Sequence, residues 1–153
     1  MEGLDVLVRK MASMGLMFLL LTLGACSSNT NGDALEDAPD YIKETWEYFN
    51  VMSKVTDAVE NGENVEVAFD KYFPNENEVI SYIDSASAES EEEQLVIDNI
   101  HLIHLKVSTM AIEDFNASMG GDPVDIDQFV YELQVPRNEL AKIYKEYGLE
   151  YNK

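Results

Sequence analysis

The spacing of apolar residues between positions 39 and 61 predicts an amphipathic helix. Apolar side chains recur there at intervals of three and four residues, which places them along one side of a helix. They are Ile42, Trp46, Phe49, Met52, Val55 and Val59. Gly62 lies where this helix should end. The segment ENGE (60–63) could instead form a hairpin turn, but the helical period already extends over about five turns, so we expect a helix.

Two shorter apolar patterns follow. Val65, Ala68 and Tyr72 fit a short helix, although the sequence VEV alternates as a strand would; we predict a helix here. Asn75 and Glu78 have the residue types and spacing of a helix start, and they open the segment ENEVISYIDSA. We therefore expect a second short helix in that segment.

The longest apolar pattern lies between Ser90 and Met119. Ser90 and Glu93 have the spacing of a capping box. The apolar residues that follow cover well over half of the helical circumference. They are Leu95, Val96, Ile100, Leu102, Ile103, Val107, Met110, Ala111 and Phe115. A helix that is apolar on most sides is expected to be central, and Gly120 and Gly121 should end it.

The rest of the chain predicts one or two further helices. Asp125 and Gln128 have the spacing of a helix start, and Pro136 should open the last helix. The sequence therefore predicts an all-α fold, a small bundle of five to six helices with a long central helix over about 90–119.

The N-terminal residues have a different pattern. Arg9 and Lys10 precede an apolar run of 13 residues (11–23), which leads into the quartet LGAC (23–26). A basic region, an apolar region and small residues, in that order, are typical of a secretory signal peptide. A helix of this length is too short to span about 30 Å of hydrocarbon, so we do not expect a membrane-spanning segment here.

The quartet LGAC resembles the lipobox of bacterial lipoproteins, with Leu23 three places before Cys26 and two small residues between them. The resemblance implies cleavage between Ala25 and Cys26, a diacylglycerol on the Cys26 sulfur and an acyl group on the new amine. Ser27 stands where an aspartate would favour retention in the inner membrane. The resemblance therefore implies a lipid-anchored protein of the cell envelope, in the outer membrane if the host has one.

These patterns divide the chain into three parts. Residues 1–25 form a lipoprotein signal peptide, residues 26–37 form the acylated cysteine and a polar spacer that we expect to be a flexible tether, and residues 38–153 form an acidic helical domain. Cys26 is the only cysteine, so the domain must be held by its core without disulfides.

The chain carries 30 acidic and 10 basic residues, for a net charge of −20. Such a surface repels phosphate backbones, which makes nucleic acid an unsuitable partner. It attracts basic proteins, basic peptides and divalent cations, although the charge could also serve only to keep the domain soluble. The run ESEEE (89–93) is either a docking patch for a basic partner or a solvated first helical turn.

His101 and His104, the only two histidines, are a candidate metal site. Their spacing places both on one side of the long helix, and Asp98 lies one turn before His101, where it could orient the ring. Zinc sites need three or four ligands, and no HExxH pattern is present. The alternative is a pair of partly buried histidines that bond a neighbouring carboxylate.

Asp122, Asp125 and Asp127 are a second candidate metal site, because calcium loops use oxygen ligands at alternate positions. The spacing of an EF-hand is not met, and capping of the next helix explains the same residues. Near the C-terminus, Tyr144, Tyr147 and Tyr151 form either an aromatic strip for a ligand or part of the core.

The sequence offers little for catalysis. It contains no GxSxG sequence and no glycine-rich phosphate loop, so we expect no enzyme and no cofactor beyond the lipid on Cys26. The predicted function is a lipid-anchored, non-enzymatic binding domain for a basic protein, of the immunity, inhibitor or accessory-subunit type. The alternative is a lipoprotein that binds a divalent metal.

Overall fold

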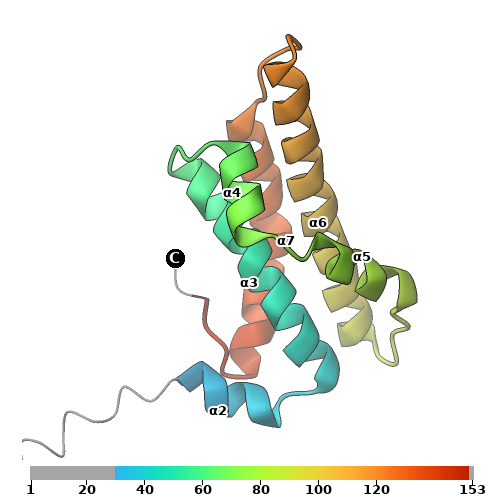
Figure 1. Ribbon diagram of the computed structural model, residues 1–153. Helices are drawn as coiled ribbons and strands as arrows, with labels where there is room; N and C mark the ends of the chain where they lie inside the picture. Colours follow the sequence, from blue (N-terminus) through green and yellow to red (C-terminus); the bar gives the residue numbers. More distant parts are fainter. Residues whose placement is uncertain (1–29, 152–153) are drawn as a thin grey trace, which may run out of the picture.

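The fold is known from a computed structural model, which describes residues 30–151. Over this range the chain forms helices and no strand, which confirms the all-α bundle (Figure 1). The helices are α2 (Thr30–Asp37), α3 (Asp40–Glu60), α4 (Val65–Tyr72), α5 (Glu76–Ser85), α6 (Glu91–Ser118) and α7 (Ile126–Glu146).

Three helices begin with the side-chain caps that their sequences favour. The Asn64 side chain accepts a hydrogen bond from the Val67 amide at 3.1 Å, and Asp125 caps α7 in the same way. The Ser90 hydroxyl accepts from the Glu93 amide at 3.1 Å, so the predicted capping box is confirmed at its serine. Each cap satisfies an amide that the helix itself leaves free.

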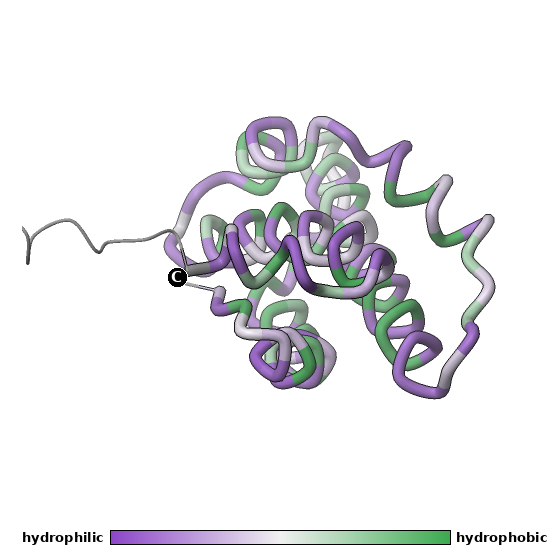
Figure 2. The backbone as a smooth tube through the Cα atoms, turned by 90° about the horizontal axis from the view of Figure 1, so that it is seen from below, coloured by the Kyte–Doolittle hydropathy of each residue, from purple (hydrophilic) through white to green (hydrophobic). Residues whose placement is uncertain are grey.

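The core lies where α3, α6 and α7 meet, with α4 packed against α3 and α6. Hydrophobic and hydrophilic stretches follow one another along the turns of the helices (Figure 2). This pattern gives a helix an apolar side that can face the core. At the centre, the Phe49 ring lies 5.1 Å from Tyr144 and 5.6 Å from Tyr151. Burial of these large rings supplies much of the hydrophobic stabilisation.

The prediction that Pro136 opens a helix was wrong. Pro136 lies inside α7, which runs without a break from Ile126 to Glu146. A proline in a helix interior removes one backbone hydrogen bond and costs about 3 kcal/mol. Leu133, Pro136 and Leu140 all face the core, so the apolar side of α7 continues through the proline and packing outweighs this cost.

The expected flexible tether is wrong for its last 8 residues, because the chain forms α2 from Thr30 to Asp37. The Asn31 side chain donates to the backbone carbonyl of Glu150 at 3.0 Å and accepts from the amide of the same residue at 3.1 Å. Ala34 and Leu35 pack against the core. These contacts come from the C-terminal end of the chain, so the composition of the spacer could not reveal them.

Helix α6 has the predicted position, but only one of its sides is covered. Val96, Ile100 and Ile103 are fully buried, whereas Leu105 is 53 % and Phe115 63 % exposed. Among residues 30–151, α6 is also the one helix long and apolar enough to cross a membrane by length and composition. Its contacts with α3, α4, α5 and α7 identify it as the core helix of the bundle, with an apolar outer side left in contact with solvent.

Candidate functional site: an acidic tyrosine groove between α3 and α5

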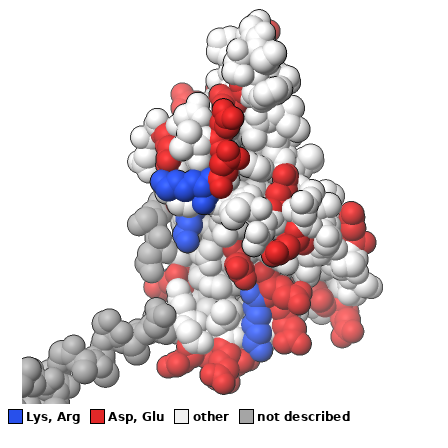
Figure 3. Space-filling view, viewed as in Figure 1, with Lys and Arg blue, Asp and Glu red and all other residues white. Residues whose placement is uncertain are grey.

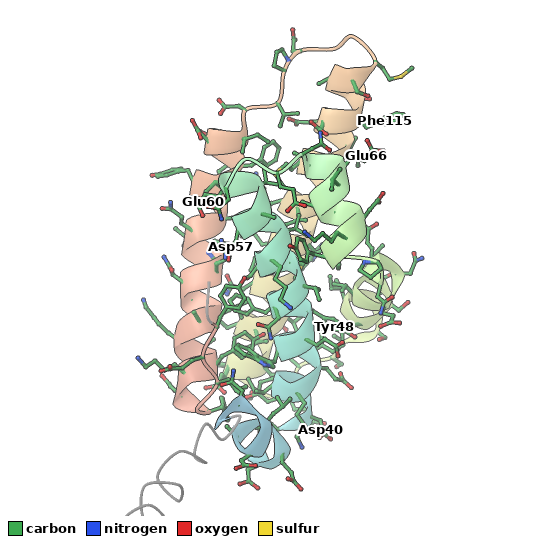
Figure 4. The ribbon with its side chains drawn as sticks, turned by 60° about the vertical axis from the view of Figure 1, so that its left-hand side comes forward. Asp40, Tyr48, Asp57, Glu60, Glu66 and Phe115 are labelled. Atoms are coloured by element: carbon green, nitrogen blue, oxygen red, sulfur yellow. The ribbon has the colours of Figure 1, made fainter. Side chains whose placement is uncertain are left out.

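A shallow groove runs between α3 and α5, and a tyrosine from each helix lines it. The rings of Tyr48 on α3 and Tyr82 on α5 lie 5.5 Å apart, tilted by 57°. In Figure 4, Tyr48 extends from α3 on the side where α5 lies. The remaining lining residues are short and polar or acidic: Glu44, Asn77, Glu78, Ser81 and Ser85. We call this feature the tyrosine groove.

Three glutamates surround the two rings. Glu44 and Glu78 line the groove itself, and Glu47 lies beside Tyr48 at the edge of the neighbouring hollow. All three are exposed, and no ion pair joins them to a basic residue within the part of the chain that the structure describes. The groove therefore presents uncompensated negative charge next to two aromatic faces.

The electrostatic effect of these glutamates is visible at the tyrosines. Burial raises the pKa of Tyr82 to about 12, and Glu44 and Glu93 add to the shift. Burial also raises the pKa of Tyr48, with further contributions from Glu44, Glu78 and Glu47. Both phenols therefore stay neutral near pH 7.

A second hollow adjoins the groove on the side of α4 and shares Tyr48 and Glu78 with it. Lys54 and Lys71 line this hollow. Lys71 is already held by Glu63 at 3.1 Å and lies 4.5 Å from the centre of the Tyr72 ring. On the face drawn in Figure 3, the blue of lysine and arginine covers much less surface than the red of aspartate and glutamate. The lysines mark the limit of the acidic groove.

The acidic run at the start of α6 has a structural role. The Glu92 carboxylate accepts hydrogen bonds of 2.6 Å from the hydroxyls of Tyr41 and Tyr147, and these bonds lower its pKa, that from Tyr147 most. The Glu93 side chain accepts from the Glu89 amide. The first-turn interpretation of this run therefore describes two of its glutamates better than a docking patch does.

The two histidines do not act together. His101 is exposed, whereas the His104 side chain is only 13 % exposed and faces α5, with its Nε2 atom 3.3 Å from Glu76 Oε1. No group of three metal-ligating side chains occurs within residues 30–151. Among the described residues, the neighbouring-carboxylate interpretation fits His104, and the carboxylate is Glu76. Asp98, which was expected to orient His101, accepts a hydrogen bond from Gln94.

Ser108 joins His104 and Glu76 to give the residue types of a hydrolytic triad, but not its geometry. The Ser108 hydroxyl donates to Glu76 Oε1 at 2.7 Å and lies 3.3 Å from His104 Nε2. In a triad the carboxylate bonds one ring nitrogen and the serine the other. Here both approach Nε2, so the carboxylate cannot orient the ring as a base for the serine. The cluster joins α5 to α6.

His104 makes the stability of the fold sensitive to mild acid. Burial lowers its pKa, and Glu76 opposes the shift only in part. In the unfolded chain, His104 therefore takes up a proton near its ordinary pKa of about 6.5. In the folded chain, it takes up this proton only at a lower pH. We expect the free energy of unfolding to fall from pH 7.5 to pH 5.5 by more in wild type than in H104Q. Urea unfolding at both pH values measures this, and equal losses would contradict it.

The three aspartates after α6 do not converge either. Asp125 caps α7 through the Gln128 amide at 3.0 Å, as the alternative interpretation held. Asp122 and Asp127 are exposed and form no ligand group among the residues that the structure describes.

The C-terminal tyrosines are part of the packing. Tyr144 is fully buried, with no hydrogen-bond partner for its hydroxyl within the described range. Tyr151 donates to Asp57 Oδ2 at 2.7 Å, and Arg137 bonds the other oxygen of Asp57 at 2.7 Å. These bonds join the C-terminal segment and α7 to α3.

No local pattern in the sequence predicts the tyrosine groove. Tyr48 and Tyr82 belong to separate helices, and their proximity depends on how α5 lies against α3. The glutamates were visible only as part of a uniformly acidic composition. Cys26, Ala25 and the predicted signal peptide lie outside the described residues, so the lipid attachment stays a prediction.

Comparison of the chain with protein-family models, with curated proteins and with solved structures gave no match. The fold and the groove themselves define the class: an acidic, all-α helical bundle with an aromatic groove on its surface.

Proposed function

We propose that this protein is a lipid-anchored, non-enzymatic binding module of the bacterial cell envelope that captures a basic protein. An immunity protein, an inhibitor of a basic toxin or hydrolase, and an accessory subunit of an envelope complex all fit this description. The tyrosine groove carries the proposal, because it combines two partly exposed tyrosine rings with exposed carboxylates that have no ion pair to a basic residue among the described residues.

The chemistry of the groove suits a lysine or arginine side chain. A cation within about 6 Å of a tyrosine ring centre is attracted to the ring face. Glu44 and Glu78 line the same groove and supply carboxylates for such a cation. Acidic residues elsewhere on α2 and on the lower part of α3 (Figure 3) add a field that accelerates the approach of a basic partner.

Attachment of the chain through Cys26 would leave the tyrosine groove accessible to a partner. The first described residues belong to α2, which lies at one end of the bundle, while the loop after α6 lies at the other end (Figure 1). A lipid on Cys26 would therefore attach the bundle by the α2 end. The tyrosine groove lies on the side of the bundle, where a partner in the same compartment can reach it.

A metal-binding function has less support. The candidate ligands are His101, His104, Asp122, Asp125 and Asp127. Within residues 30–151 they form no group of three or more that could hold a metal ion, and His104 Nε2 already lies 3.3 Å from Glu76 Oε1. No observation on the described residues favours this alternative, and we do not carry it further.

Replacement of the groove glutamates tests the proposed function. We expect the full-length chain with E44Q, E47Q and E78Q, in detergent, to bind a decalysine peptide about tenfold more weakly than wild type, since exposed charge pairs contribute about 0.2–1 kcal/mol each. Isothermal titration at two salt concentrations gives the affinity and its salt dependence.

The matched control is E36Q, E139Q and E146Q, which changes the net charge equally at exposed positions away from the groove. This variant should bind decalysine within about twofold of wild type. Equal weakening in both variants would show that net charge alone binds the peptide, and would overturn the assignment of the groove.

A further inference from the structure

Five exposed apolar residues lie on the outer side of α6 and at its C-cap, at positions that fit alternating intervals of three and four. Eight positions between 95 and 119 follow this rule without a break. Five are apolar and well exposed, from 42 % at Leu102 to 76 % at Met119: Leu95, Leu102, Leu105, Ile112 and Met119. The other three are Asp98, Thr109 and Asn116. We call these eight positions the α6 seam.

The spacing of the seam is that of a two-stranded coiled coil. Apolar residues that repeat every 3.5 residues let two helices pack with their side chains interdigitated. The seam extends over about three and a half heptads, a length typical of coiled coils. The opposite side of α6 is already buried against α3 and α7, so the seam is a second packing surface on the same helix.

The charge along the seam permits a second copy of the same chain to approach. From Asn99 to Ile112, α6 contains no aspartate or glutamate, although the chain has a net charge of −20. Its one lysine in this stretch, Lys106, is paired with Glu132 of α7. At physiological salt, charges more than about 8 Å away are largely screened, so the acidic surfaces on either side oppose this contact only weakly.

We propose that two copies of this chain associate through the α6 seam as an antiparallel, two-fold symmetric pair of helices. This inference is independent of the tyrosine groove, which lies between α3 and α5. In the antiparallel register that pairs all eight positions, Leu102 faces Ile112 of the second copy. Leu95 faces Met119, and Leu105 faces Thr109.

The polar positions select the antiparallel direction. In the same register Asp98 faces Asn116, whose amide can donate a hydrogen bond to the carboxylate. A parallel pair would place Asp98 against Asp98 of the second copy, and like charges in such a contact are destabilising. One polar position of this kind is sufficient to fix direction and register in coiled coils.

Cysteine cross-linking of the full-length chain in isolated membranes tests the proposal. Two differently tagged copies are co-expressed, one with Leu102→Cys and the other with Ile112→Cys, and treated with a short bis-maleimide. We expect a cross-link between the two tags, and little product from either variant alone. The control pair, Val67→Cys with Ile80→Cys, places cysteines on α4 and α5 at exposed apolar positions outside the seam, and should give only the background of the wild-type chain.

A product from Leu102→Cys alone that equals the mixed product would indicate a parallel pair, and no product above the control would indicate that the seam binds no second copy. Either result overturns the proposal. Leu105→Glu in both tagged copies provides a second measurement, because it places like charges near the two-fold axis. The mixed cross-link should fall about tenfold or more, while circular dichroism should still show a folded helical chain, because Leu105 is exposed in the single copy. Full cross-linking in this variant would also overturn the proposal.

Discussion

Phe49→Ala is expected to lower the free energy of unfolding by about 3–5 kcal/mol, the range for removal of a buried phenylalanine ring. Phe49 is 1 % exposed, and its ring contacts Trp46, Tyr144 and Tyr151. The small side chain would leave a cavity where α3, α7 and the C-terminal segment meet. Urea unfolding measured by circular dichroism gives the change, and the fluorescence of Trp46, the only tryptophan, reports on the same region.

Phe115→Ala is the matched control, since it removes the same side chain from a helix. Phe115 is 63 % exposed near the end of α6 (Figure 4), and surface substitutions usually change stability by less than about 0.5 kcal/mol. Comparable losses in the two variants would mean that the end of α6 is packed in solution, which contradicts the exposed side described above.

Cys26→Ala is expected to abolish the incorporation of fatty acid into the protein. If the lipobox resemblance holds, the Cys26 sulfur is the attachment point, and cleavage after Ala25 requires the lipid to be attached first. Cells grown with an alkyne-labelled fatty acid should therefore label the wild-type chain and not the variant. The variant should accumulate as a larger, uncleaved precursor on a denaturing gel.

Ser27→Ala is the control for that experiment, because it changes the neighbouring residue and keeps the thiol. It should be labelled and cleaved like wild type. Labelling of the Cys26→Ala chain would show that the fatty acid is attached at another residue, which contradicts the lipobox assignment.

The sequence predicted most of the helices because their signals are local. The apolar period in α3, the caps at Ser90 and Asp125, and the glycine at position 62 all act within a few residues. Gly62 ends its helix with a φ of +88°, a conformation that favours glycine. Pro136 misled the prediction because continued packing of α7 on the core is a tertiary effect.

The surfaces proposed for binding were less accessible to sequence reasoning. The sequence shows that α6 has many apolar residues. It does not show which of them the other helices cover and which stay exposed. Leu105 and Ile103 look equally apolar in the sequence, yet one is exposed and the other buried. The tyrosine groove likewise depends on the position of α5, which no local pattern specifies.

The mass of the N-terminal peptide of the protein isolated from its host membranes tests the central claim, that the bundle is attached to a bilayer by lipid. The account predicts a peptide that begins at Cys26 and exceeds the unmodified mass by a diacylglycerol and one further acyl group. Together these chains supply a durable anchor, because each buried methylene contributes about 0.8 kcal/mol. A peptide with a free thiol at Cys26, or one that still contains the residues before it, would contradict the account.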